Sequence, residues 1–416
     1  MTVSVQKSPA RRDSAPPRRR RAGRVVIAAA AAVCLGGAAA VVVPRLLHRN
    51  PPRVCATDAV QARALDDLAA FAGWLSRNDV PGYVGEVGWP GGGADAAAWA
   101  GVAQVWYDAA DSIGLPVTAW AAASWPTGYP MAVYRRSAGS TAIDSPGPQA
   151  AILDGHPSTR QYLRGVVLAG GSFGSPTGAD PGRYGYDYSY ENAPGYAYLA
   201  SQGVRLIRLT LSWERLQHRP GGPLDAAELS RLHKALSLAH TNGIAVVLDL
   251  HGYGTYASPS HLVLGSAALP VERLADLWSK LAAAIGDEPA VTGFDLLNEP
   301  VRLAAHGAHG ADGARLWERA SQEAVDAVRA TGSRQYIAVT GYGQTGPGHL
   351  GDLHPRAWIS DPAHRTVYET HAYFDSDSSG HYAAGYAAEL GRLPSAGHTC
   401  RALAALAPSA PVFAAS

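Results

Sequence analysis

The sequence predicts an α/β fold in which eight parallel strands close into a (β/α)8 TIM barrel with helices outside it. Short apolar runs alternate with segments of helical periodicity along most of the chain. The runs do not alternate between apolar and polar residues, which is typical of parallel strands that are covered on both faces. With 416 residues and 47% hydrophobic composition, the chain is large enough to bury the core of such a barrel.

The first 54 residues differ in composition from the rest of the chain. Residues 1–24 form a basic, proline-rich tail, residues 25–43 an uncharged apolar run, and residues 44–54 a short linker. An apolar run of this length can span a bilayer, and the arginines before it favour the cytoplasmic side. We therefore expect a transmembrane anchor that leaves residues 55–416 on the extracellular face. A cleaved signal peptide, and hence secretion, is the alternative.

The cysteines agree with export. Cys34 follows Val33, which is a poor match to a lipoprotein cleavage site. Cys55 and Cys400 would then lie outside the membrane, one at each end of the folded part. Two such cysteines in an exported protein permit a disulfide, and we predict one between them.

The overall charge is close to neutral. A formal net charge of +1 gives no reason to expect a nucleic-acid partner. We expect a monomer that needs no cofactor and no metal.

The first part of the folded region supplies two strands. A helical pattern from Asp58 to Leu75 precedes a short strand at Tyr83–Glu86. A second amphipathic helix ends at Gly114 and leads to a strand at Val117–Trp120. A loop of about forty residues rich in Gly, Ser and Pro follows.

A regular alternation of strand and helix then begins. The six strands are predicted at Arg164–Ala169, Arg205–Leu211, Ile244–Leu250, Val291–Leu297, Tyr336–Thr340 and Thr366–Tyr373. The helices that separate the middle strands end at Asn242-Gly243, at Gly286 and at Ala330. Near the end of the chain, Pro411–Phe413 could form a ninth strand, but no polar residue that could serve chemistry follows it.

Polar and aromatic residues collect where the predicted strands end. They are Glu86, Trp120, Arg208, His251, Asn298, Glu299, His371 and Tyr373. In a parallel barrel the carboxyl ends of the strands form the active site, so we expect these side chains to meet there. Two carboxylates across a barrel mouth suit glycoside hydrolysis by the retaining route, in which the two groups lie about 5 Å apart.

The surroundings of the two carboxylates suggest their roles. Glu299 follows the apolar run Phe294–Leu297, and burial there is expected to raise its pKa, as a general acid requires. Glu86 would be the nucleophile, kept ionised by Arg208. The glycines on either side of Glu86 are expected to let the backbone and a sugar come close.

The remaining residues would bind the sugar. Asn298 can form a hydrogen bond with the sugar 2-hydroxyl as charge develops. Tyr373 can position the nucleophile, and Trp120 offers a flat apolar floor for a sugar face.

These residues resemble glycoside hydrolase family five, the cellulase-like retaining hydrolases on a TIM barrel. The matching segments are Tyr83–Pro90, Val117–Trp125, Leu163–Gly174, Arg183–Tyr190, Ile207–Gln217, Leu248–Tyr256, Phe294–Pro300 and Tyr368–Gly380. The resemblance implies that Glu299 is the acid/base and Glu86 the nucleophile. It also implies that the other six strand-end residues line the subsite between the two carboxylates.

The order of the segments departs from the family. The nucleophile strand and the Trp strand come last in the family but first in this chain, which predicts a circular permutation. Cys55 and Cys400 would flank the old junction, and Ala410–Phe413 would be a relic of the seventh strand. Gly252 stands where the family commonly has Asn, and Gln344 where many members have Trp, so the preferred glycan is open.

Several residues have two interpretations. Glu369 is a rival nucleophile, or it lies one layer deeper in the barrel beside Arg205 or Arg208. The tyrosines between residues 184 and 190 either line distal sugar subsites or hold a long loop in place. His306 and His309 could form a metal pair but are better explained as solvated. Trp213-Glu214 could be catalytic but more simply orients a loop.

The expected function is therefore a retaining endo-β-1,4-glucanase acting on polysaccharide. Another β-glycan, such as mannan or a polymer of the cell envelope, is the alternative substrate. A carbohydrate-binding pseudoenzyme is the alternative class, because the permutation could leave the two carboxylates misplaced.

Overall fold

The computed structural model describes residues 53–123, 128–257, 261–304, 310–343, 346–394, 399–403 and 412–413. The basic tail, the apolar run 25–43 and nearly all of the linker lie outside these residues, as do His306, His309 and Gln344. Among the helices that the structure describes, none has the length and apolar character needed to cross a membrane.

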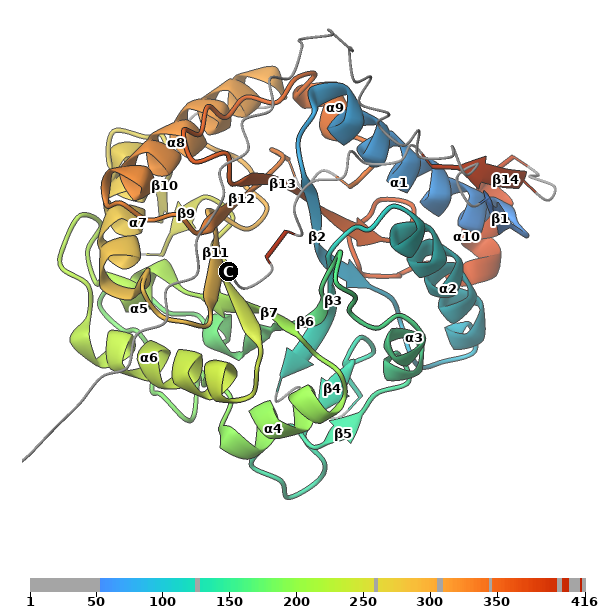
Figure 1. Ribbon diagram of the computed structural model, residues 1–416, viewed down its shortest axis with the longest axis horizontal. Helices are drawn as coiled ribbons and strands as arrows, with labels where there is room; N and C mark the ends of the chain where they lie inside the picture. Colours follow the sequence, from blue (N-terminus) through green and yellow to red (C-terminus); the bar gives the residue numbers. More distant parts are fainter. Residues whose placement is uncertain are drawn as a thin grey trace, which may run out of the picture. The chain divides into compact units, whose positions relative to one another are not determined.

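Parallel strands close into a barrel at the centre of the fold, as predicted (Figure 1). In chain order they are β2 (Gly82–Gly88), β3 (Val117–Ala123), β6 (Arg164–Leu168), β7 (Leu206–Leu211), β8 (Ala245–Leu250), β11 (Val291–Asp295), β12 (Tyr336–Thr340) and β13 (Thr366–Tyr373). Each strand pairs with the next one along the chain. The ring closes because the last strand, β13, pairs in parallel with the first, β2.

Helices surround this ring (Figure 1). The longer ones are α1 (Ala59–Asn78), α2 (Ala96–Ser112), α4 (Ala193–Ser201), α6 (Ala226–Thr241), α7 (Glu272–Ile285) and α8 (Ala311–Ala330). The shorter ones are α3 (Ala150–Gly155), η1 (Ala169–Ser172), α5 (Trp213–Leu216), α9 (Leu350–Leu353) and α10 (Tyr386–Arg392). Side-chain caps fix several starts: Asp58 accepts hydrogen bonds from the backbone N–H groups of Val60 and Gln61, and Asp225 accepts one from Glu228.

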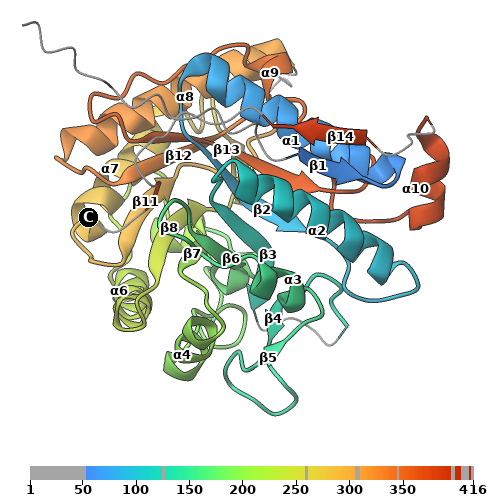
Figure 2. The ribbon, with the colours of Figure 1, turned by 45° about the vertical axis from the view of Figure 1, so that its right-hand side comes forward.

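Short strands lie outside the ring. The antiparallel pairs are β4 (Tyr134–Arg135) with β5 (Ser145–Pro146), and β9 (Thr255–Tyr256) with β10 (Leu262–Val263). A third pair, β1 (Arg53–Ala56) with β14 (Thr399–Ala402), joins the two ends of the folded region. This pair lies against α1 in both ribbon views (Figure 2).

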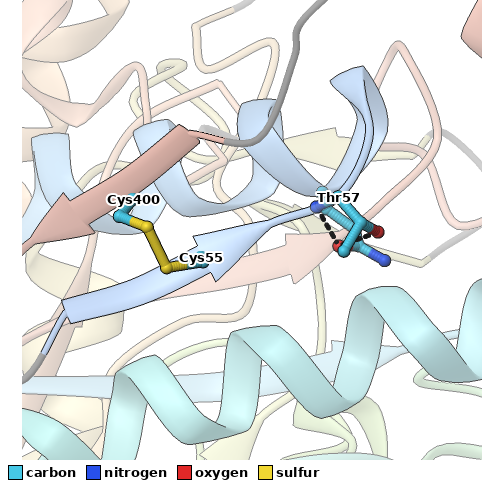
Figure 3. The surroundings of a disulfide bond; sticks show 4 residues. Cys55, Thr57 and Cys400 are labelled. Atoms are coloured by element: carbon cyan, nitrogen blue, oxygen red, sulfur yellow. Dashed lines mark hydrogen bonds between the residues drawn. A yellow bond between two sulfur atoms is a disulfide. The ribbon is translucent and has the colours of Figure 1, made fainter.

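A disulfide links β1 to β14 (Figure 3). Cys55 and Cys400 are direct partners in the strand register, their sulfur atoms are 2.02 Å apart, and 345 positions separate them in the sequence. Beside the bond, the backbone N–H of Thr57 donates to Oε1 of Gln61 at 2.8 Å, at the start of α1 (Figure 3). The sequence had indicated this pair of cysteines.

The expected ninth strand is not formed by the two residues of it that the structure describes. Val412 and Phe413 make a turn, and both side chains are buried at the amino ends of the barrel strands. The Phe413 ring lies 4.9 Å from the ring of Tyr83 and 5.5 Å from that of Tyr336. The strand interpretation was therefore wrong for these residues, because an apolar Val-Phe pair can equally fill the base of a barrel.

The strand that carries the Asn-Glu-Pro sequence is shorter than predicted. β11 ends at Asp295, and Leu296 to Glu299 continue as a loop over the barrel mouth. Glu299 itself has a φ of 41°, in the left-handed region that side chains rarely adopt. The loop rather than the strand therefore sets the direction of this carboxyl group.

Candidate active site

The predicted strand-end residues form one connected cluster. Arg208 contacts both Glu86 and Asn298, and Tyr373 donates to Glu86. His371 contacts Glu299 and lies 3.7 Å from Glu86. The Trp120 ring stacks on His251 with 5.7 Å between centroids and 14° between planes. Strands and loops far apart in the sequence thus bring all eight predicted residues to the same end of the barrel.

Glu86 is held by two donors. Its Oε1 accepts a hydrogen bond from Nη1 of Arg208 at 2.8 Å, and its Oε2 accepts one from the hydroxyl of Tyr373 at 2.6 Å. The residue is only 3% exposed. A buried carboxylate with a guanidinium and a phenol as donors is fixed in orientation.

Arg208 is the centre of a buried charge cluster. Besides Glu86, its guanidinium lies 2.9 Å from Asp249, 2.6 Å from Asp295 and 3.3 Å from Glu369. Burial opposes the charge, but these carboxylates more than offset it and raise the pKa of Arg208 well above its usual range. One arginine therefore stays charged and orients several acidic side chains at once.

Asp295 and Glu369 form a second layer beneath this arginine. Both are completely buried, and one oxygen of each has no hydrogen-bond partner among the described residues. Burial and the neighbouring charge of Glu369 raise the pKa of Asp295 well above its usual range. The neighbouring carboxyl group of Glu369 therefore favours the protonated form of Asp295, because two like charges this close repel each other.

Glu299 pairs with His371. Oε1 of Glu299 lies 2.7 Å from Nδ1 of His371, and the imidazole is only 6% exposed. Burial opposes the charge of His371, but the carboxylates of Glu86, Glu299 and Glu369 raise its pKa well above the usual range. The imidazole is thus basic enough to compete with Glu299 for a proton.

The expected rise in the pKa of Glu299 is wrong. Burial does raise its pKa, as the apolar run before it suggested, and burial is the largest single effect. The hydrogen bond and charge of His371, together with the charges of His251 and Arg208, outweigh burial and lower the pKa overall. The missing partner lies 72 residues further along the chain, on β13.

The two carboxylates face each other at short range. One ligand atom each of Glu86, Glu299 and His371 lie within 4.8 Å of one another. Ligand atoms this close fit the carboxyl separation of about 5 to 5.5 Å in retaining glycosidases better than the about 6.5 to 9.5 Å of inverting ones.

The same three residues are the group best placed to hold a metal ion within the described ranges. Both oxygens of Glu86 already accept hydrogen bonds, and Nδ1 of His371 is engaged with Glu299. A cation would have to displace these bonds, so the geometry suits two reacting carboxylates better than a metal centre.

The two glycines around Glu86 serve a purpose that the sequence did not predict. A Cβ at Gly85 would lie 1.5 Å from Oε1 of Glu369, and one at Gly88 would lie 2.7 Å from the ring of Tyr373. These glycines make room for protein side chains, because β13 packs directly against β2. The approach of a sugar to this backbone stays a prediction.

Asn298 has a free donor. Its Oδ1 accepts from Nη2 of Arg208 at 2.9 Å, while its Nδ2 is buried and has no partner among the described residues. Arg208 therefore fixes the orientation of the amide so that its NH2 group points away from the guanidinium. This NH2 group can donate a hydrogen bond to a ligand.

Aromatic side chains extend the site. Nε1 of Trp120 donates to the hydroxyl of Tyr129 at 2.7 Å, and the hydroxyl of Tyr253 lies 3.3 Å from Nε2 of His251. Sequence reasoning missed both tyrosines, although Tyr253 follows His251 by two residues. It also missed Asp249, whose Oδ2 lies 2.8 Å from Nδ1 of His251. An acidic residue inside an otherwise apolar strand was the signal available.

The structure also bears on the residues with two interpretations. Glu369 is completely buried one layer below the mouth, in contact with Arg208 and His371. Arg205 instead donates to the backbone carbonyls of Ala200 and Val204. This position agrees with the deeper interpretation of Glu369 and leaves it unable to reach a substrate.

The tyrosine-rich loop divides into two kinds of residue. Tyr188 and Tyr190 are buried and donate hydrogen bonds to Glu228 on α6, each at 2.6 Å. Tyr184 and Tyr186 are 41% and 78% exposed. The first pair holds the loop, whereas the second pair is available to a ligand.

Trp213 and Glu214 have structural contacts. Trp213 is buried, and Glu214 accepts hydrogen bonds from the Ser212 hydroxyl and from the backbone N–H of Ala257. These contacts orient the segment after β7.

A cavity of about 1010 Å³ lies at the opposite end of the barrel. Its walls include residues just before or at the starts of several barrel strands, among them Leu163, Arg205, Ala245 and Arg365. It has no connection with the two facing carboxylates and is not the active site.

Known proteins resemble this chain in sequence. A family model described as Cellulase (glycosyl hydrolase family 5) matches residues 169–402. Endoglucanase gh5-1 of Neurospora crassa is 31% identical over 230 residues, which cover 55% of this chain and 54% of that protein. The manganese dependent endoglucanase Eg5A of Phanerodontia chrysosporium is 27% identical over 252 residues, or 58% of each chain. The chain spans about half the length of these relatives.

Solved structures give similar matches. Endoglucanase Cel5A of Pseudomonas stutzeri in complex with cellobiose is 36% identical, with a TM-score of 0.47, over 53% of this chain and 62% of that one. The matched range of the family model begins after β6 and ends in β14, so it leaves out β2 and β3.

Proposed function

The chain belongs to the cellulase family, glycosyl hydrolase family 5, and on this premise we propose that it is a retaining endo-β-1,4-glucanase. The observation that carries the proposal is the pair of facing carboxylates, Glu86 and Glu299, with ligand atoms within 4.8 Å of each other. One carboxylate is ion-paired and the other is bonded to an imidazole. Retaining hydrolysis needs this combination of one ionised group and one proton donor.

In the first step Glu86 attacks the anomeric carbon and forms a covalent glycosyl–enzyme. Arg208 and Tyr373 hold the attacking carboxylate in one orientation, which lowers the entropic cost of reaching the transition state. The glycosidic bond breaks, and its oxygen takes a proton from Glu299. His371 shares that proton with Glu299 through the 2.7 Å contact.

In the second step water hydrolyses the glycosyl–enzyme. Glu299, now a carboxylate, accepts a proton from the water while the oxygen attacks the anomeric carbon and Glu86 leaves. The free Nδ2 of Asn298 is placed to donate to the sugar 2-hydroxyl, a bond that strengthens as charge develops on the ring.

The names of the relatives support β-1,4-glucan as the substrate, because several are called endoglucanases or endo-β-1,4-glucanases. Exposed or half-exposed aromatic rings support a polymeric sugar. They include Trp120, Tyr253 and Tyr186, whose flat faces can stack on sugar rings.

A panel of soluble polysaccharides tests the activity. We expect the purified protein to release oligosaccharides from β-1,4-glucan faster than from mannan or cell-envelope glycan, with the β-anomer of the product appearing first by NMR. Glu86→Gln and Glu299→Gln are the controls. Binding of glucan without turnover by the unmodified protein would identify a pseudoenzyme instead.

We also propose that the barrel is circularly permuted relative to the family. Support comes from the family match, which begins after β6, and from the Glu86 strand, which precedes that match in the chain. The pairing of β13 with β2 means that a rearranged order would need no new strand neighbours. A chain in which the segment carrying β2 and β3 follows β13 should fold and hydrolyse the same substrate.

The protein is further proposed to act outside the cell. The Cys55–Cys400 disulfide supports an oxidising compartment, and the apolar run 25–43 supports export. Fractionation distinguishes anchoring from secretion. An anchored protein stays with membranes after a high-salt wash and keeps residues 1–24, whereas a secreted one loses residues 1–24 and the apolar run 25–43.

A further inference from the structure

We propose that Glu369 is a positioning residue that determines where the catalytic proton rests between Glu299 and His371. The inference rests on the proposed hydrolytic function, in which Glu299 delivers that proton. Glu369 itself is fully buried and touches no substrate, so it acts through the imidazole.

The imidazole of His371 bridges two carboxyl groups. Its Nδ1 lies 2.7 Å from Oε1 of Glu299, and its Nε2 lies 3.4 Å from Oε1 of Glu369. Glu369 and His371 are two residues apart on β13, so both side chains point into the barrel, one layer apart. A carboxylate at Nε2 favours a proton on that nitrogen and thereby leaves Nδ1 facing Glu299 as the exchange partner.

The barrel is shaped around Glu369. No side chain fits at Gly85, because its Cβ would overlap Oε1 of Glu369, and Arg208 Nε holds the same oxygen at 3.3 Å. The carboxyl group therefore has one available position, between the guanidinium and the imidazole.

Other ionisable groups surround this chain of contacts. They are Tyr83 and Glu86 on β2, Arg208 on β7, Asp249 on β8 with His251 and Tyr253 after it, Asp295 on β11, Glu299 on the loop after β11, and Tyr373 on β13. Glu86 also faces His371, at 3.7 Å from Nδ1. Glu369 differs from the others because it alone contacts Nε2 in the described part of the chain.

The charges around Glu299 and His371 determine how strongly this pair holds its proton. The pair of Glu299 and His371 holds one proton at working pH, and that proton goes to the leaving oxygen and returns from the attacking water. A negative charge at Nε2 strengthens the hold of the pair on its last proton. When Glu369 is replaced by Gln, the carboxyl group beside Nε2 is lost, whereas Asp295 keeps its contact with Arg208. The pair should then lose its proton at lower pH.

The test is Glu369→Gln in the full protein, with the pH profile of kcat/KM and nitrogen NMR of His371 as readouts. We expect the basic limb of the profile to move to lower pH by about half a unit or more. In the unmodified protein we expect the neutral imidazole to carry its proton on Nε2. A basic limb that does not move, or a neutral His371 protonated on Nδ1, overturns the proposal.

Glu228→Gln is the matched control. It makes the same change to a buried carboxyl group, but Glu228 lies on α6. Within the described residues its side chain bonds two tyrosines and an arginine, all outside the site. The basic limb of the kcat/KM profile of Glu228→Gln should coincide with that of the unmodified protein. The NMR measurement needs neither turnover nor a folded variant, so it tests the role of Glu369 separately. An inactive unmodified protein with the expected tautomer would instead refute the proposed function.

Discussion

Removal of the disulfide should destabilise the fold without changing the chemistry. In the double variant Cys55→Ser/Cys400→Ser the unfolded chain is no longer closed over 345 positions. The chain-entropy relation gives about 6 kcal/mol for a loop of this length, and measured effects of about 2 to 4 kcal/mol are typical. We expect about 3 kcal/mol, because unfolded chains retain some structure.

This free energy converts to a modest change in melting temperature. Unfolding entropy of about 2.1 cal/mol/K per residue, over roughly 360 residues, gives about 0.75 kcal/mol/K. A loss of about 3 kcal/mol then lowers Tm by about 4 °C. Calorimetry of the unmodified protein and of the double variant, each with and without reductant, measures it.

The disulfide variant is compared with the unmodified protein under reducing conditions. Reductant should lower Tm of the unmodified protein to that of the double variant and should leave the variant unchanged. Because Cys55 and Cys400 pair outside the barrel, kcat/KM at 25 °C should stay within about twofold. An unchanged Tm would refute the stabilising role of the Cys55–Cys400 disulfide. Lost activity in a folded variant would show that the β1–β14 pair is coupled to the site.

Three further changes test the site. Glu299→Gln should lower kcat on glucan by about 10² to 10⁴, and much less on an aryl glycoside whose leaving group needs no proton, which steady-state kinetics would show; equal losses on both substrates would contradict the acid role. Gly85→Ala should cost about 1 to 3 kcal/mol by denaturant unfolding, since the new Cβ overlaps Glu369, and a neutral effect would mean that this contact is relieved freely. The raised pKa of His371 stabilises the fold fully below its unfolded value of about 6.5, and this contribution is lost as pH rises through the folded value. Unfolding measured from pH 6 to pH 10 should show this decline in the unmodified protein and a smaller one in His371→Gln.

The barrel and the two facing carboxylates could be predicted because both leave local signals. A buried parallel strand is an apolar run in the sequence, and Glu86 and Glu299 stand in or just after such runs. Active sites of parallel barrels lie at the carboxyl ends of the strands, and this rule places both carboxylates at the same end of the barrel.

The electrostatics could not be read in the same way. The pKa of Glu299 depends on His371, and its backbone direction depends on a left-handed φ of 41° after the strand has ended. Neither property is encoded in the neighbouring residues. Asp249 and Asp295 were missed for the same reason: each is an acidic residue in an apolar strand, and only the position of Arg208 between them explains it.

The base of the barrel illustrates a different limit. Val412 and Phe413 have the composition of a strand, but a two-residue apolar segment carries no periodicity. Only the space left between Tyr83 and Tyr336 explains why the Phe413 ring lies there.

The pairing of β13 with β2 has a consequence for how the molecule is made. The ribosome produces Glu86 early, on a strand whose outer edge has no neighbour until nearly the whole polypeptide has emerged. Under the proposed function, hydrolysis would require this last strand, because it brings His371 and Tyr373 to the two carboxylates. A fragment that stops short of β13 would lack these contacts to Glu86 and Glu299, however much of the barrel it contains.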